Sequence, residues 1–365
     1  MANKRKIRRI GILTAGGDSP GLNAAIRAVG KACLGTYGIE VMGIHDGFRG
    51  LIDKNARLMA LDDFSGILTI GGTILGTGRD KPEKMRMPDG SVRDMTADAV
   101  RSYRELELDC LVCLGGGGTQ RNALHLRQAG MEVMTLPKTI DNDIWGTDVS
   151  FGYDTAVSIA TEAVDRLHST AESHQRIMVL ELMGNQTGWI TLAAGLAGGA
   201  DVILIPELQY DPAIVAESIL SRSRRGKRFS IVAVAEGIFP PEEVARAKQE
   251  GVELPRRDHR EEGPGAIVAR QLTQMTGLET RETVLGYVQR GGTPTARDRI
   301  LATAVGTKCA ELLAQGKTGF LVACKGDKCR PVPLEEVAGK RNVVPPDHPL
   351  VQSARAVGIC MGDQL

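Results

Sequence analysis

The sequence predicts an α/β protein with two domains, each built on a mainly parallel β-sheet. Short apolar runs rich in β-branched residues alternate with helical patterns over almost the whole chain. This alternation is typical of βαβ units, whose strands lie parallel and whose crossovers are right-handed. About fourteen such elements exceed one doubly wound sheet. The 365 residues are also enough for two hydrophobic cores.

Eight strands are expected in chain order, each separated from the next by a helical stretch or a loop. In the helical stretch 21–34, Leu22, Ile26, Val29 and Cys33 fall near one face, as in a helix that packs against a sheet. The expected strands are 7–15, 39–44, 109–114, 131–136, 176–182, 201–205, 229–235 and 281–287.

The composition gives no sign of a nucleic-acid or membrane partner. Lys plus Arg (45) nearly balance Asp plus Glu (44), so the net charge is only +1. No apolar run approaches the roughly 20 residues of a membrane span. The basic N-terminus is followed by an apolar stretch too short for a signal peptide. We therefore expect a cytoplasmic protein.

The seven cysteines are expected to be reduced thiols, as in a cytosolic protein. The odd spacing of Cys110 and Cys113 inside a strand puts them on opposite faces, which indicates core packing rather than a redox pair. Cys324 and Cys329 flank a KGDK segment that resembles a hairpin turn. We expect neither a disulfide nor a metal there.

Three further features concern domain boundaries and the surface. The boundary between the two domains is expected near residues 145–153. The charged segment 253–265 contains Gly and Pro and is expected to be an exposed loop. The basic cluster 222–228 indicates a helix C-terminus more than an anion-binding effector site.

Two glycine-rich segments follow strands directly and precede helices. The first, TAGGDSPGLN (14–23), contains Gly16, Gly17 and Gly21, and the second is the run of four glycines at 115–118. Glycine permits a close backbone approach, and a helix N-terminus with free amides binds anions. Each segment alone could be a simple turn. Together, at the carboxyl ends of two strands, they favour a phosphate cradle.

A third segment, LPKTIDNDIWGTD (136–148), also follows a strand and carries the charges that phosphoryl transfer needs. Asp141 and Asp143 could provide a general base and a magnesium contact, while Lys138 could neutralise charge on the transferred group. Thr139 lies between Lys138 and Asp141. The alternative is an Asx-rich turn with solvated charges.

Together these segments resemble the phosphofructokinase family over roughly residues 7–325. The motifs that carry the resemblance occur in the family's order and are ILTAGGDSPGLNAAIRAV, GGTILGTGRD, PKTIDND, DRLHSTAESHQRI, LAAGLAGGADVILIPE, GKRFSIVAVAEG and ETRETVLGYVQRGGTPTARDRILA. The resemblance implies two Rossmann-like three-layer αβα domains with mainly parallel sheets. The phosphoryl-donor domain would comprise 1–150 and about 289–338, and the sugar-phosphate domain about 151–288 and 339–365.

The resemblance also implies an ATP-dependent 6-phosphofructokinase of glycolysis, which needs Mg²⁺ and converts fructose 6-phosphate to fructose 1,6-bisphosphate. Asp141 would be the base, Thr139 and Lys138 would lie beside it, and Asp143 would contact the magnesium. The donor site would comprise Gly17, Arg79, Asp80, Gly116, Gly117, Gly118 and Thr119. The sugar-phosphate site would comprise Thr139, Ile140, Asp141, Arg176, Met183, Gly184, Asn185, Glu236, Arg281, Tyr287 and Arg290. Arg176 and Arg281 would reach across from a neighbouring subunit of a homo-oligomer, a tetramer or a dimer.

Two departures from the family pattern leave alternatives open. Gly117 stands where a magnesium-binding Asp is usual, and Asn185 stands where an Arg is usual. A degenerate regulatory subunit is therefore one alternative, and a lipid or NAD kinase is a more distant one. Gly118 leaves room for a nucleotide and favours ATP, whereas Lys138 is typical of relatives that use pyrophosphate. The steric argument outweighs the other, so ATP is the expected donor.

Overall fold

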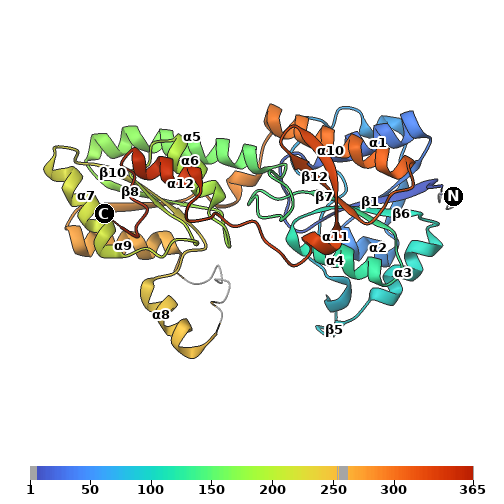
Figure 1. Cartoon of the computed structure of the whole chain (residues 1–365), viewed down its shortest axis with the longest axis horizontal. Coiled ribbons are helices and arrows are strands. Elements are labelled where there is room, and N and C mark those ends of the chain that lie inside the picture. The colour runs from blue at the N-terminus through green and yellow to red at the C-terminus, as the bar shows by residue number, and fades with distance from the viewer. Residues whose placement is uncertain (1–5, 253, 255–261, 365) are drawn as a thin grey trace. The chain divides into compact units, whose positions relative to one another are not determined.

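The computed structural model describes residues 6–252, 254 and 262–364. The chain forms two compact units, which are described separately below (Figure 1). Unit 1 comprises Met1–Thr155 and Arg290–Asn342, and unit 2 comprises Ala156–Gln289 and Val343–Leu365. In the part of the chain that the structure describes, no helix is both long and apolar enough to span a membrane.

Unit 1 contains a seven-stranded sheet with the order β13-β12-β7-β6-β1-β2-β3. Its five central strands are parallel, and the edge pairs β2–β3 and β12–β13 are antiparallel. The strands are β1 (Arg9–Ala15), β2 (Glu40–Ile44), β3 (Ala56–Leu58), β6 (Cys110–Gly115), β7 (Val133–Pro137), β12 (Phe320–Lys325) and β13 (Lys328–Pro333). A separate small hairpin pairs β4 (Met85–Arg86) with β5 (Val92–Arg93).

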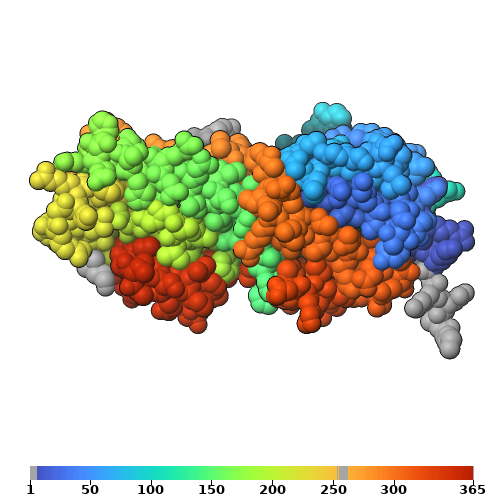
Figure 2. All heavy atoms as spheres, turned by 90° about the horizontal axis from the view of Figure 1, so that it is seen from above, coloured from blue at the N-terminus to red at the C-terminus, as the bar shows by residue number. Residues whose placement is uncertain are grey.

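Helices cover both faces of this sheet because its strands are apolar on both sides. One face packs against α1 (Leu22–Ala32) and α10 (Ala296–Ala314), which lie side by side in Figures 1 and 2. The other face packs against α2 (Gly47–Asp53), α3 (Thr96–Glu105), α4 (Gly117–Gln128) and α11 (Leu334–Val337). Cys110 belongs to the first core and Cys113 to the second, so the predicted placement on opposite faces is confirmed.

Unit 2 contains a four-stranded, wholly parallel sheet with the order β11-β8-β10-β9. Its strands are β8 (Ile177–Leu182), β9 (Val202–Leu204), β10 (Ser230–Ala235) and β11 (Thr280–Val284). The helices are α6 (Trp189–Ala197), α7 (Pro212–Arg224), α8 (Pro241–Glu250), α9 (Pro264–Thr276) and α12 (Pro349–Ala356), together with most of α5 (Tyr153–His174). Apolar residues of α7 and α9 form one core with β8, β9 and β10.

All eight expected strands are present, and most boundaries agree within two residues. The expected strand 281–287 is wrong at its end. The strand stops at Val284, and a 3₁₀ turn over Gly286–Arg290 follows, in which Gly286 has φ 53°. The expected helix 21–34 ends at Ala32 and continues as a π-helical turn, Cys33–Tyr37. Most of the expected loop 253–265 lies outside the described residues.

Candidate active site

In unit 1 the three predicted segments gather at one edge of the sheet. Gly16 follows β1, Gly116 follows β6 and Lys138 follows β7, and these three strands are parallel neighbours. The chain passes from β1 to β2 in one direction and from β6 to β7 in the other. The order therefore reverses between β1 and β6, and the crevice at such a reversal is where open α/β sheets bind ligands.

The four glycines form the entry to α4. Gly115 ends β6, Gly116 is extended, and α4 begins at Gly117 without a side-chain cap. The first amides of the helix are thus available to an anion. A Cβ added at Gly117 or at Gly118 would meet no atom within 4 Å. These two glycines therefore border open space, and side chains there would project into it.

The predicted donor residues from other segments lie beside this loop. Thr119 Oγ1 donates to the carbonyl of Ala15 at 3.4 Å, which connects α4 to the end of β1. Gly16, whose φ of 88° suits glycine, donates its N–H to the carbonyl of Gly78 at 2.8 Å. This bond brings the segment with Arg79 and Asp80 to the same edge. Asp80 is paired with Arg49 at 3.1 Å.

Lys138 and Arg290 bring two cations to the first glycine loop. The Lys138 ammonium donates to the carbonyl of Gly17. A Cβ added at Gly17 would lie 2.7 Å from Arg290 Nη1, so this guanidinium lies directly against the glycine. Asp18 Oδ1 lies 3.8 Å from the same nitrogen. Two cations next to free helix amides can bind the polyanionic chain of a phosphoryl donor.

Burial lowers the pKa of Lys138 to about 8, and the Arg290 guanidinium acts in the same direction. The carboxylates of Asp18, Asp141 and Asp143 oppose this shift. In the folded protein without ligand, the buried charge of Lys138 thus lowers the free energy of unfolding. Bound phosphate would offset that cost by pairing with the ammonium group.

This shift predicts a pH dependence of stability. Between about pH 8 and the ordinary lysine pKa of about 10.5, the unfolded chain binds more protons at Lys138 than the folded chain does. The free energy of unfolding should therefore rise with pH across this window, by at most about 3 kcal/mol, and stay level below about pH 8, where both states carry the proton. Urea unfolding of the ligand-free protein at pH 7 and pH 9.5 measures it. Lys138→Met should lack this contribution, and parallel pH curves for the two proteins would contradict the assignment.

Asp141 and Asp143 are held apart by the buried residue between them. Asn142 has a left-handed backbone, with φ 52°, and its side-chain oxygen accepts the N–H of Ser150 at 2.9 Å. The N–H of Asp141 donates to Thr139 Oγ1 at 3.1 Å. The segment is therefore a turn, but its charges are not all solvated as the alternative interpretation required, because Asp143 Oδ1 is buried. The Asn142 side chain fixes this turn through its bonds with Ser150, and the two carboxylates lie on either side of it in the sequence.

The chain near residue 342 also supports this turn, through contacts that were not predicted from the sequence. The N–H of Asn342 donates to the carbonyl of Asp143 at 2.9 Å, and Asn342 Nδ2 donates to the carbonyl of Asn142 at 3.0 Å. Arg341 pairs with Ile144 in a β-bridge. No local signal could have revealed these contacts, because they join segments about two hundred residues apart.

Asp143 fits a contact to Mg²⁺. Its Oδ1 is buried and has no hydrogen-bond partner among the described residues. Burial raises its pKa, while the Arg341 guanidinium acts in the opposite direction. A buried carboxylate oxygen without a donor is suited to a divalent cation. Within the described residues, no group of three or more His, Cys, Asp or Glu side chains could hold a metal. The remaining ligands would come from phosphates and water.

In unit 2 a second set of predicted residues follows β8, β10 and β11. Met183 and Gly184 follow β8, and the N–H of Met183 donates to Gln289 Oε1 at 3.3 Å. Glu236 follows β10 and donates its N–H to the carbonyl of Leu182 at 2.8 Å. A Cβ added at Gly237 would lie 2.0 Å from the carbonyl oxygen of Asn185, so these two loops touch.

Tyr287 lies in the turn after β11 and is 61% exposed. The structure therefore gathers Met183, Gly184, Asn185, Glu236 and Tyr287 at the carboxyl edge of the unit 2 sheet. Thr139, Ile140, Asp141 and Arg290, the other predicted sugar-phosphate residues of the same subunit, belong to unit 1.

Arg176 and Arg281 lie at the opposite edge of the unit 2 sheet. Arg176 precedes β8, and Arg281 is the second residue of β11, which pairs in parallel with β8. Both arginines pair with Glu279, Arg176 Nε at 2.7 Å. The six residues between Arg176 and Met183 span roughly 20 Å of extended chain. These arginines therefore do not join the Met183 group within one chain.

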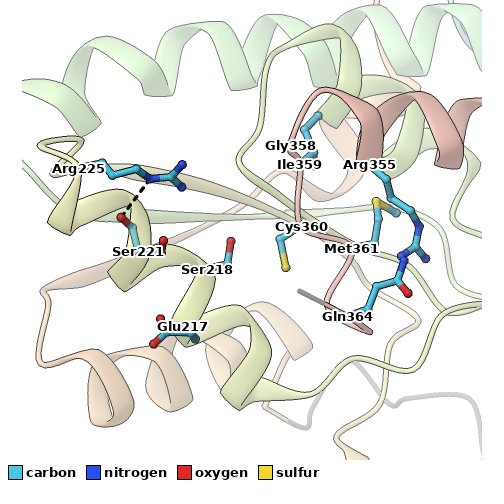
Figure 3. A pocket seen from close by; sticks show the side chains of 10 residues that line it. All are labelled: Glu217, Ser218, Ser221, Arg225, Arg355, Gly358, Ile359, Cys360, Met361 and Gln364. Atoms are coloured by element: carbon cyan, nitrogen blue, oxygen red, sulfur yellow. Dashed lines mark hydrogen bonds between the residues drawn. The ribbon is translucent and has the colours of Figure 1, made fainter.

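A cavity of about 420 Å³ also opens in unit 2, between α7 and the C-terminal segment (Figure 3). None of its lining residues belongs to the predicted site. Arg225, on its rim, donates Nε to the carbonyl of Ser221 at 3.3 Å, and Arg222 pairs with Asp201 at 2.8 Å. The basic cluster 222–228 thus includes arginines that bond at the end of α7.

Comparison with known proteins identifies related sequences. The family model described as phosphofructokinase matches residues 9–313. The chain is 54% identical over 362 residues to an ATP-dependent 6-phosphofructokinase of Spirochaeta thermophila, with 98% of both chains covered. It is 53% identical over 380 residues to an ATP-dependent 6-phosphofructokinase of Propionibacterium freudenreichii, with 97% of this chain and 99% of that one covered.

Solved structures show the same fold. A phosphofructokinase of Pichia pastoris, described in its T-state, superposes with a TM-score of 0.77 at 31% identity. The match covers 92% of this chain but only 36% of the Pichia chain. A pyrophosphate-dependent phosphofructokinase of Nitrosospira multiformis has a TM-score of 0.80 at 19% identity, covering 98% of this chain and 93% of that one.

Proposed function

This chain belongs to the phosphofructokinase family, and on that premise we propose that it is an ATP-dependent 6-phosphofructokinase. The reaction transfers the γ-phosphoryl group of ATP to the 1-hydroxyl of fructose 6-phosphate and gives fructose 1,6-bisphosphate and ADP, a step of glycolysis. The observation that carries the proposal is the convergence of two glycine loops, two cations and Asp141 at the strand reversal of unit 1.

Asp141 is the general base of the proposed mechanism. Its carboxylate accepts the proton of the sugar 1-hydroxyl as that oxygen forms a bond to the γ-phosphorus and the bond from phosphorus to the β,γ-bridging oxygen breaks. The hydrogen bond from its N–H to Thr139 Oγ1 orients the turn. Lys138, Arg290 and the first amides of α4 bind the phosphate oxygens, on which negative charge is concentrated.

Magnesium bound to the donor phosphates would neutralise part of their charge. Asp143 is the residue that would hold it, through the buried Oδ1 described above. Gly117 leaves no carboxylate on the opposite loop, and so water and phosphate oxygens would complete the coordination.

The donor is decided by a direct assay of the purified protein with fructose 6-phosphate, Mg²⁺ and either ATP or pyrophosphate. We expect turnover with ATP, as the names of the relatives at 54% and 53% identity support. Lys138 is the one observation that favours pyrophosphate. A preference for pyrophosphate would overturn the donor assignment, and no turnover with either donor would favour the degenerate regulatory subunit.

Gly118→Asp should lower kcat/KM for ATP by about 10²-fold, because a carboxylate would project into the space proposed for the nucleotide phosphates. The variant should fold, since an added Cβ meets nothing within 4 Å. Gly117→Asp is the matched control, because it borders the same open space and adds the same charge one residue earlier. We expect this control to keep ATP activity, because an Asp that contacts magnesium is usual at this position in the family, so its charge would be neutralised by the metal. Equal losses in both variants would contradict a specific role of Gly118.

We also propose that the enzyme is a homo-oligomer with shared active sites, in which Arg176 and Arg281 bind the sugar phosphate of a neighbouring subunit. Arg176 and Arg281 lie at the edge of the sheet opposite Met183, which supports their binding in a neighbouring subunit's site. The seven free thiols support a cytoplasmic location.

Mixing two inactive variants tests whether neighbouring subunits share active sites. Asp141→Asn and Arg176→Ala subunits should regain activity when they are dissociated and reassociated together, because some mixed sites receive both native residues. Asp141→Asn mixed with Arg290→Ala should stay inactive, since these two residues belong to the same unit of one chain. Failure of the first mixture, with light scattering showing mixed oligomers, would contradict shared sites. That result would not contradict the proposed ATP-dependent activity, which the donor assay tests separately.

A further inference from the structure

Cys324 and Cys329 face each other across a hairpin of unit 1. They are directly paired in the antiparallel register of β12 and β13, and Gly326 and Asp327 form the turn between the strands. Side chains of paired residues point to the same face of a sheet. The predicted hairpin turn is therefore confirmed, and it brings the two thiols together.

The backbone hydrogen bonds of Cys324 identify the kind of pair. Its N–H donates to Thr147 Oγ1 at 2.9 Å, and its carbonyl accepts the N–H of Asp148 at 2.9 Å. Both groups thus bond away from β13, so Cys324 and Cys329 form a non-hydrogen-bonded pair. The Cα atoms of such pairs lie about 4.5 Å apart, a separation that a disulfide can span with little backbone movement.

Exposure distinguishes Cys329 from the other thiols. Cys329 is half-buried, whereas the remaining six cysteines are buried. Oxidants therefore reach Cys329 most readily, and its nearest partner in register is Cys324. The other five are Cys33, Cys110, Cys113, Cys309 and Cys360.

We propose that Cys324 and Cys329 are a redox modification site at which a hydroperoxide forms a reversible cross-strand disulfide. The thiolate of Cys329 attacks one peroxide oxygen, which breaks the O–O bond and leaves a sulfenic acid and one water molecule, or an alcohol. The thiolate of Cys324 then attacks that sulfur and releases a second water after proton transfer. Two thiols lose two electrons and two protons in total, and the peroxide gains them.

The disulfide would act on the segment that carries Asp141. Thr147 and Asp148, which bond to Cys324, end that segment. The adjoining turn also holds Asp148, whose carboxylate accepts Lys325 Nζ at 2.9 Å and the N–H of Gly326 at 2.8 Å. A bridge that restrains the hairpin therefore restrains the anchor of the 138–148 segment.

Burial of the two thiols and the charges around them determine the rate of oxidation. Burial raises the pKa of both thiols, and the nearby Cys324 raises that of Cys329 further. Oxidation is thus slower at neutral pH than at alkaline pH. The charged groups near the pair are Asp148, Asp327, Arg297 and Lys325 around Cys324, and Lys308 beside Cys329.

Treatment of the purified full-length protein with hydrogen peroxide, followed by alkylation and peptide mass spectrometry, tests the proposal. We expect a disulfide between the peptides of Cys324 and Cys329 that dithiothreitol reverses, with the five buried thiols still alkylated after unfolding. Hydrogen exchange at the Asp148 amide should slow by about tenfold in the oxidised protein, because the closed hairpin opens less often.

Single substitutions separate the two thiols. In Cys324→Ser, peroxide should leave a sulfenic acid at Cys329 that dimedone traps, and in Cys329→Ser, Cys324 should remain reduced. Cys360→Ser, the control, should form the disulfide as the unmodified chain does. The proposal is overturned by a bridge between other cysteines, by a 324–329 bridge that forms only in urea, or by unchanged exchange at Asp148.

Discussion

Asp141→Asn should lower kcat by about 10³-fold, within the range that a lost general base typically costs. The amide has nearly the same shape, so the hydrogen bond from the backbone N–H to Thr139 Oγ1 should persist. KM for fructose 6-phosphate should change little, because proton acceptance contributes in the transition state rather than in substrate binding. Initial rates at saturating ATP and Mg²⁺ measure both constants.

Asp98→Asn is the control for this experiment. Asp98 lies in the first turn of α3, also in unit 1, and pairs with Arg101 at the surface. This variant should keep the activity of the unmodified chain. A fall of less than about tenfold in the Asp141 variant would show that another group accepts the proton.

Lys138→Met should lower kcat by about 10²-fold to 10³-fold and at the same time stabilise the ligand-free protein. The ammonium is buried beside the carbonyl of Gly17, where it can stabilise charge on the transferred phosphoryl group. Its charge is also costly there, as the lowered pKa shows. A residue that reduces stability and raises activity is expected where a site is shaped for its ligand.

Two measurements distinguish this role from a structural one. The melting temperature without ligand should rise in Lys138→Met, whereas loss of a structural residue would lower it. Lys54→Met is the control, because Lys54 is an exposed lysine of the same unit that pairs with Glu105 at 2.7 Å. An Lys138 variant with normal kcat would remove this lysine from the proposed mechanism.

The parts of the site that could be predicted depend on short stretches of sequence. The glycine loops and the Lys138–Asp143 turn each follow a strand directly, and strand, turn and helix signals are local. The parallel arrangement then places all three at one edge, which the alternation of strands and helices already implied. The same reasoning placed Cys110 and Cys113 on opposite faces, as observed.

The parts that could not be predicted depend on contacts between distant segments. The hydrogen bond from Asn342 to Asp143 and the one from Asp148 to Cys324 leave no trace in sequence spacing. The early end of β11 has a more local cause, since Gly286 with positive φ begins the turn that carries Tyr287. The strand was predicted to continue to residue 287 because apolar residues follow Val284.

The sequence by itself determined the α/β class, the order of the elements and the residue types available for phosphoryl transfer. These follow from hydrophobic periodicity and from motifs within a few residues. Only the tertiary structure decided which groups are buried, since burial depends on what the rest of the chain packs around them. It thereby showed Lys138 as a buried cation with a lowered pKa, Asp143 Oδ1 as a buried oxygen suited to a metal, and two cysteines as a cross-strand pair.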